Sequence, residues 1–170
     1  MTKPNKSMKL QVLGLCAAML GCSHHPGPAQ PDLSQALELE AQFPTTTVRA
    51  GSVVHGLFVL HNGSGGPVSF CQTDGGGVSV WVQLEDGETP RPLVLHGMVS
   101  DTTCNERTTL QSGESKTFPQ DFGVFHDWAG PIRILGSLRV HRVPEQQQGP
   151  GELSSSIRTP PTLLTIIPAV

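Results

Sequence analysis

Residues 132–143 read Ile-Arg-Ile-Leu-Gly-Ser-Leu-Arg-Val-His-Arg-Val, the most regular apolar–polar alternation in this 170-residue chain. Four aliphatic side chains share one parity: Ile132, Ile134, Leu138 and Val140. Three polar side chains share the other: Arg133, Arg139 and His141. Successive side chains of a β-strand point to opposite faces of its sheet, so this period of two predicts a strand with one buried and one polar face.

Other segments carry related patterns. Residues 37–43 and 78–84 alternate in the same way, and Trp81 lies on the polar side of the second segment. Residues 52–61 are nearly all apolar, which predicts a central strand covered on both sides. Residues 62–66, Asn-Gly-Ser-Gly-Gly, predict a hairpin loop after that strand.

Turn-forming residues are frequent, with 19 glycines and 15 prolines in the chain. We therefore expect an all-β domain over residues 36–170, an antiparallel Ig-like β-sandwich of about seven to nine strands. Residues 121–130 contain Phe122, Phe125 and Trp128, and we expect these rings to plug one end of its core.

The order of these segments resembles that of bacterial Ig-like sandwiches of about 120 residues. The resemblance is carried by residues 53–62, 67–70, 110–114 with Phe118, and 130–140. The chain is also similar to small Ig-like proteinase-inhibitor domains of the BsuPI type, although no matched residue carries that activity. The resemblance implies a sandwich fold and leaves the function open.

The first 22 residues have the composition of an export signal. Three lysines precede an apolar run of about 11 residues, which is too short to span a bilayer and matches a secretory signal peptide. The run ends in Met-Leu-Gly-Cys at residues 19–22, which resembles the lipobox of bacterial lipoprotein signals. The resemblance implies cleavage before Cys22 and a diacylglycerol on its sulfur, often with a further acyl chain such as palmitate, which together give stable membrane anchoring.

This interpretation divides the chain into a signal peptide (1–21), a lipid-anchored, Pro-rich tether (22–35) and the sandwich (36–170). Ser23 after the cysteine resembles the outer-membrane sorting signal, so we expect the protein in the bacterial cell envelope, at the outer membrane. Two alternatives stay open. One is a plain secreted protein cut near Ala17 or Ala18, and the other is a translation start at Met8.

Cleavage would leave an acidic protein. The 11 basic residues lose three lysines with the signal, so eight remain against 14 acidic residues, a net charge of about −6. The arginines are scattered along the sequence, whereas nucleic-acid binding needs a clustered basic face. We therefore expect no nucleic-acid partner, and membrane association through the lipid alone.

Two cysteines, Cys71 and Cys104, remain after the signal and the lipid site are set aside. In an exported protein such a pair most simply forms a disulfide. The enclosed loop of about 33 residues would stabilise the fold by roughly 3–4 kcal/mol. A metal site and two free thiols are the alternatives.

The chain shows no catalytic motif, so we expect a protein that is not an enzyme and has no cofactor. Ser64 lies in Gly-Ser-Gly-Gly, which is not a nucleophile elbow, and no serine or cysteine is marked as a partner for His126 and Asp127. His96 and Met98 have the His-x-Met pattern of soft copper sites, but Met98 is the only methionine after cleavage. We therefore expect no metal site, and keep a copper-handling lipoprotein using these residues and His126 as an alternative.

The remaining candidate is a binding surface that contains Trp81, Arg133 and Arg139, because aromatic and arginine side chains dominate binding hot spots. Trp81 could instead belong to a second core, and the arginines to a solvated sheet face. The leading hypothesis is a non-enzymatic envelope lipoprotein that binds an envelope protein or glycan. An inhibitor of an exported proteinase, with residues 149–156 as its bait loop, is a further alternative.

Overall fold

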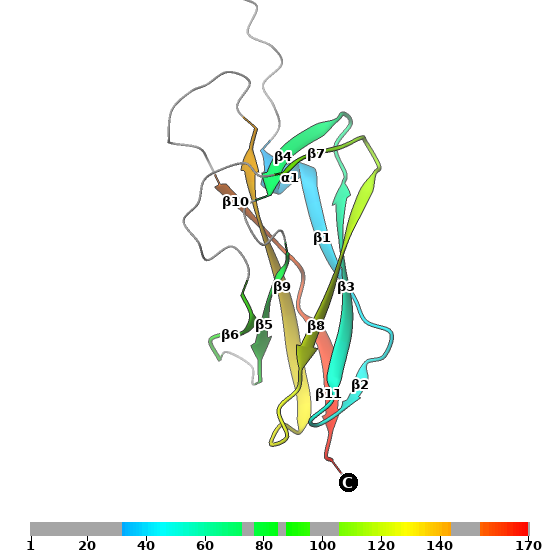
Figure 1. Ribbon diagram of the computed structural model, residues 1–170, viewed down its shortest axis with the longest axis vertical. Helices are drawn as coiled ribbons and strands as arrows, with labels where there is room; N and C mark the ends of the chain where they lie inside the picture. The colour runs from blue at the N-terminus through cyan, green and yellow to red at the C-terminus, as the bar shows by residue number, and fades with distance from the viewer. Residues whose placement is uncertain (1–31, 73–76, 85–87, 96–105, 144–153, 170) are drawn as a thin grey trace, which may run out of the picture.

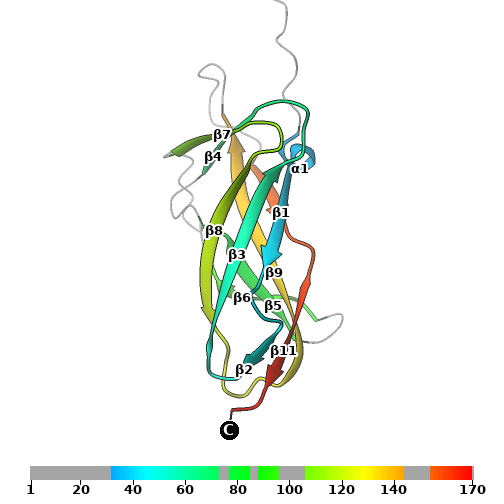
Figure 2. The same ribbon diagram turned by 90° about the vertical axis from the view of Figure 1, so that its right-hand side faces the viewer.

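The computed structural model describes residues 32–72, 77–84, 88–95, 106–143 and 154–169. These residues form one short helix and eleven strands, packed as a sandwich of two sheets (Figures 1 and 2). The elements are α1 Leu33–Ala36, β1 Leu37–Gln42, β2 Thr47–Arg49, β3 Val53–Asn62, β4 Val68–Gln72, β5 Ser79–Gln83, β6 Arg91–Val94, β7 Glu106–Leu110, β8 Ser115–Gly123, β9 Gly130–Arg142, β10 Ser154–Arg158 and β11 Thr162–Ile167. The predicted all-β, Ig-like sandwich is confirmed.

Strand β9, predicted from its alternation, is central in the larger sheet. Along one edge it pairs with β11 and then β10, and along the other with β5 and then β4, always antiparallel. Its aliphatic residues Ile132, Ile134, Leu138 and Val140 are buried, whereas Arg139 is exposed and Arg133 partly buried. The smaller sheet has the order β1-β3-β8 and covers the buried face of the larger one.

Gly136 occupies an inward-facing position of β9 where the opposite sheet leaves no room for a side chain. A Cβ atom there would lie 2.4 Å from Cε1 of Phe58, a fully buried ring of β3 in the opposite sheet. The backbone N–H of Gly136 donates to the Thr159 hydroxyl at 2.8 Å. The two sheets therefore approach closely at this point, through a ring from one and bare backbone from the other.

The predicted burial of β3 on both sides is wrong. Its burial alternates, with Val54, Phe58 and Leu60 inside and His55 exposed. Val53 is 55% exposed and Leu57 37% exposed. The strand is central in the smaller sheet, but the described residues cover only its inner face.

The predicted hairpin after β3 is also wrong. Strand β3 pairs with β1 and β8, whereas β4 pairs with β7 and β9, so residues 63–67 carry the chain from one sheet to the other. Glycine-rich composition predicted the turn correctly. It could not predict which sheet the next strand joins, because that depends on long-range pairing.

Two polar links, one buried and one partly buried, join the sheets near this crossover. The Asn62 side chain, with 0% exposure, donates to the carbonyl oxygens of Gly66, Leu110 and Gln111 at 2.9–3.1 Å. Lys116 of β8 donates to Oε1 of Gln72 in β4 at 2.7 Å. Both links satisfy polar groups that would otherwise be costly to bury.

Three further details differ from the sequence-based expectation. Helix α1 packs into the core through Leu33, which is 2% exposed, so residues predicted to belong to the tether contribute to the core. Strand β2 pairs in parallel with β11, an exception in an otherwise antiparallel sandwich. Phe122 is buried as predicted, but Phe125 is 58% exposed and stacks edge-on against Trp128 instead of plugging the core.

Candidate docking surface

Trp81 is held on the outer face of the larger sheet by strand β5. Its neighbours Val80 and Val82 are buried, so alternation directs the indole away from the core, where it is partly exposed. In the register of the sheet Trp81 lies opposite Leu135 of β9 and Pro92 of β6. The predicted orientation of Trp81 is confirmed, and its role in binding stays a prediction.

Arg133 and Arg139 lie on the same outer face as Trp81. On β9, Arg133 lies two residues before Leu135 and Arg139 lies four residues after it, so all three side chains point to the same face. Arg139 is exposed. The two arginines are separated by about 20 Å, at roughly 3.3 Å per residue. The structure thus brings the three predicted residues onto one surface, around Leu135.

Two arginines that were not among the predicted site residues also lie on this surface. Arg158 of β10 is exposed and lies opposite Ser137, and Arg107 of β7 is exposed and lies in one row with Cys71 and His141. Neither residue was predicted to lie on a strand. The only signal was a short alternation around the buried Ile157, too brief to predict a strand.

We name the outward side chains Trp81, Arg107, Arg133, Leu135, Arg139 and Arg158 the arginine face. The outward residues of the described strands of the larger sheet include no Asp or Glu. Three described carboxylates lie on the outer face of the smaller sheet, namely Glu38 and Glu40 of β1 and Asp121 of β8. The fold therefore places arginines that are scattered in the sequence on one face of the sandwich, opposite the face that carries Glu38, Glu40 and Asp121.

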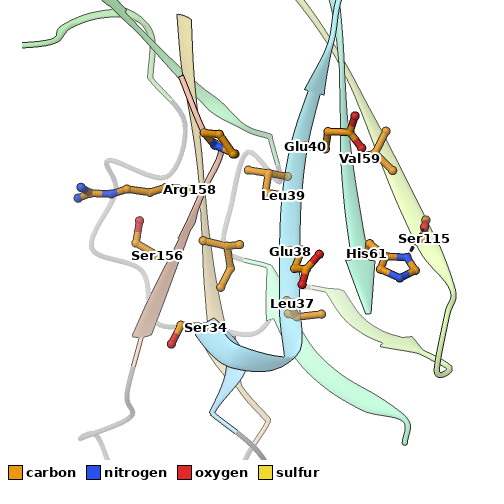
Figure 3. A pocket seen from close by; sticks show the side chains of 12 residues that line it. Ser34, Leu37, Glu38, Leu39, Glu40, Val59, His61, Ser115, Ser156 and Arg158 are labelled. Atoms are coloured by element: carbon orange, nitrogen blue, oxygen red, sulfur yellow. Dashed lines mark hydrogen bonds between the residues drawn. The ribbon is translucent and has the colours of Figure 1, made fainter. Parts of the chain in front are cut away.

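An open groove of about 580 Å³ runs along strand β1, the edge of the smaller sheet (Figure 3). Its walls include Glu38, Glu40 and His61 on one side and Ser156 and Arg158 on the other. Arg158 points away from β1 in Figure 3. The groove therefore separates the carboxylates from the arginine face and does not join them into one site.

Within this groove His61 and Ser115 form a side-chain hydrogen bond. Nδ1 of His61 lies 3.0 Å from the Ser115 hydroxyl, and Glu38 is opposite His61 in the register of β1 and β3. His55 and Asp121 form a second such link, at 2.8 Å, and both side chains are more than 60% exposed. These contacts tie β3 to β8 on a solvent-facing surface, where ion pairs contribute little to stability.

The predicted metal and bait residues are only partly described. His96 and Met98 lie outside the described residues, and His126 is an exposed loop residue whose ring packs over Gly51. The part of the chain that the structure describes holds no group of three or more potential metal ligands. Of the predicted bait loop, Ser154–Ser156 belong to β10 and pair with β9, so this portion is strand and not an extended loop.

The predicted disulfide and the predicted lipid site both involve cysteines outside the described residues. Cys71 is 2% exposed in β4, while Cys104 and the lipid-site residue Cys22 lie outside. The disulfide and the lipid attachment therefore stay predictions. No helix among the described residues has the length and apolar character needed to cross a membrane.

Comparison with known proteins does not name a family. No family model matches the chain, and no curated protein matches it. Among solved structures, the sporulation control protein Spo0M of Bacillus subtilis shares 14% identity over 79% of this chain and 50% of its own, with a TM-score of 0.43. The CARDB domain of PF1109 from Pyrococcus furiosus, solved with two metal ions, shares 13% identity over 77% of this chain and 87% of its own, with a TM-score of 0.42.

A third solved structure, the C-terminal domain of wzt, shares 10% identity over 79% of this chain and 75% of its own, with a TM-score of 0.43. These proteins have different functions, and similarity at this level carries no functional argument. The chain spans about half the length of Spo0M.

Proposed function

We propose that this chain is a lipoprotein of the bacterial cell envelope whose sandwich is a non-enzymatic docking module for an anionic envelope protein or glycan. The observation that carries the docking role is the arginine face. A partly exposed Trp81 shares one outer face with four arginines, and tryptophan and arginine are residue types that dominate binding hot spots. Electrostatic complementarity would steer an acidic partner to this face.

The anchoring role rests on the first 22 residues. The lipobox-like end of the apolar run would place a diacylglycerol on Cys22, with further acyl chains making the attachment stable. Helix α1, where the described chain begins, lies at one end of the long axis of the sandwich (Figure 1). An anchor at Cys22 would therefore hold the domain by one end and leave both sheet faces open to neighbours.

Replacing Cys22 tests the anchor. We expect the wild-type protein to incorporate radiolabelled palmitate and to sediment with membranes. Cys22→Ala should incorporate none and lose its stable membrane association, because no other group carries lipid. Cys16→Ala is the matched control: it changes a cysteine inside the predicted signal and should retain labelling. Absence of palmitate in the wild type, or undiminished labelling in Cys22→Ala, would refute the lipoprotein assignment.

A further inference from the structure

The outer faces of the two sheets carry opposite charge. Glu38 and Glu40 are exposed on β1, and Asp121 is exposed on β8, whereas the described outward residues of this smaller sheet include no lysine or arginine. The larger sheet carries the arginine face. We name the outward side chains Glu38, Glu40, His55, Leu57, His61 and Asp121 the carboxylate face.

The spacing of the charges on the two faces is similar. Glu38 and Glu40 are two residues apart on one strand, so their Cα atoms are separated by about 7 Å. Arg139 and Arg158 are diagonal neighbours on β9 and β10, because Arg158 is opposite Ser137. Diagonal neighbours in an antiparallel pair are separated by about 7–8 Å. Two carboxylates of one copy could thus meet two guanidinium groups of another at one contact.

Both faces also expose aliphatic surface that such a contact would cover. Leu57 on the carboxylate face is 37% exposed, and Leu163, opposite Arg133 on the larger sheet, is 55% exposed. Contacts between like faces would place arginines against arginines or carboxylates against carboxylates. Charge therefore disfavours a two-fold dimer through either face and favours pairing of unlike faces.

We propose that the anionic partner of the arginine face is the carboxylate face of a second copy of this chain, so that copies associate face to back in a row. The proposal rests on the docking role assigned above and specifies its partner. Stacking unlike faces by translation keeps every N-terminus at the same end of the row. Copies anchored in one membrane leaflet would therefore keep the same orientation, and membrane attachment would raise their effective concentration.

The test uses full-length, lipidated protein bearing either of two epitope tags, co-expressed in pairs and solubilised in mild non-ionic detergent. The carboxylate variant is Glu38→Arg with Glu40→Arg, and the arginine variant is Arg139→Glu with Arg158→Glu. Wild-type copies should co-purify. Either variant paired with itself should be recovered about tenfold less, because attraction at two charge pairs becomes repulsion. The carboxylate variant paired with the arginine variant should co-purify again.

Controls separate self-association from misfolding and from shared micelles. Thermal melting of each variant should match the wild type, because all four positions are exposed. Arg91→Glu changes charge at a residue that pairs with Glu88 and lies opposite the buried Val82, so it should leave co-purification intact. Failure of wild-type copies to co-purify, or undiminished recovery of either variant with itself, would overturn the self-association. Palmitate labelling tests the lipid anchor at Cys22 separately, so the self-association can fail while the lipoprotein assignment holds.

Discussion

At the scale of single residues, Asn62 shows how a buried polar side chain can be essential to the crossover between sheets. Its amide donates to three carbonyl oxygens, and its Oδ1 accepts from the backbone N–H and the hydroxyl of Ser64. Its backbone N–H and C=O bond to Glu114 and Gly113. One residue thus organises both the residues 63–67 crossover and the turn before β8.

We expect Asn62→Ala to lower the free energy of unfolding by about 3 kcal/mol, because it leaves buried carbonyl oxygens without donors. Chemical denaturation monitored by circular dichroism measures the loss. Ser69→Ala is the matched control: it removes the Ser69–Thr109 hydrogen bond at a more exposed position and should cost about 0.5 kcal/mol. Equal losses in both variants would contradict the assigned role of Asn62.

Phe125 was predicted to plug the core but is exposed. Phe125 is apolar enough for a core, yet it lies in an exposed loop, because the buried Phe122 and the half-buried Phe43 already fill that end of the sandwich. Hydrophobicity predicts that a side chain can be buried. Whether it is buried depends on space that other segments leave.

At the scale of secondary-structure elements, strands with strict alternation were predicted well. The period of two in β1, β5 and β9 reports directly which side faces the core. The shorter strands β7 and β10 were not predicted from the sequence, and they present Arg107 and Arg158. Short strands depend on pairing with neighbours more than on their own pattern.

Strand β4 contains Cys71, and its predicted disulfide with Cys104 can be tested. If Cys71 of β4 is disulfide-bonded to Cys104, the Cys104→Ser variant should lose roughly 3–4 kcal/mol of stability, since the bond closes a loop of about 33 residues. Intact mass after alkylation without reductant should show neither cysteine modified in the wild type. Alkylation of both thiols in the native protein would show that the bond is absent. Cys71→Ser alone would be harder to interpret, because Cys71 is also buried.

At the scale of the whole molecule, the division of charge has a measurable consequence. A protein with a net charge of about −6 after cleavage should pass through a sulfonate resin if only the net charge mattered. At pH 7 and about 0.1 M salt the Debye length is about 10 Å, so the resin senses mainly the face that approaches it. We expect the lipidated protein to be retained through its arginine face.

The charge-reversed pair Arg139→Glu with Arg158→Glu should elute at clearly lower salt than the wild type, whereas Arg91→Glu should shift elution less. Stepwise salt elution in non-ionic detergent measures both. Passage of the wild type in the flow-through would show that the arginine face does not act as a local positive surface.

The sequence by itself determined the sandwich class, the inward and outward sides of the long strands, and the orientation of Trp81, Arg133 and Arg139. These follow from a local property, the two-residue repeat of a strand. The predicted lipid site at Cys22 likewise depends on a contiguous motif. Only the tertiary structure decided that β3 and β4 belong to different sheets, and that arginines from β7, β9 and β10 share one face opposite the carboxylates. Strand pairing over long sequence separations sets these relations, and no local pattern encodes them.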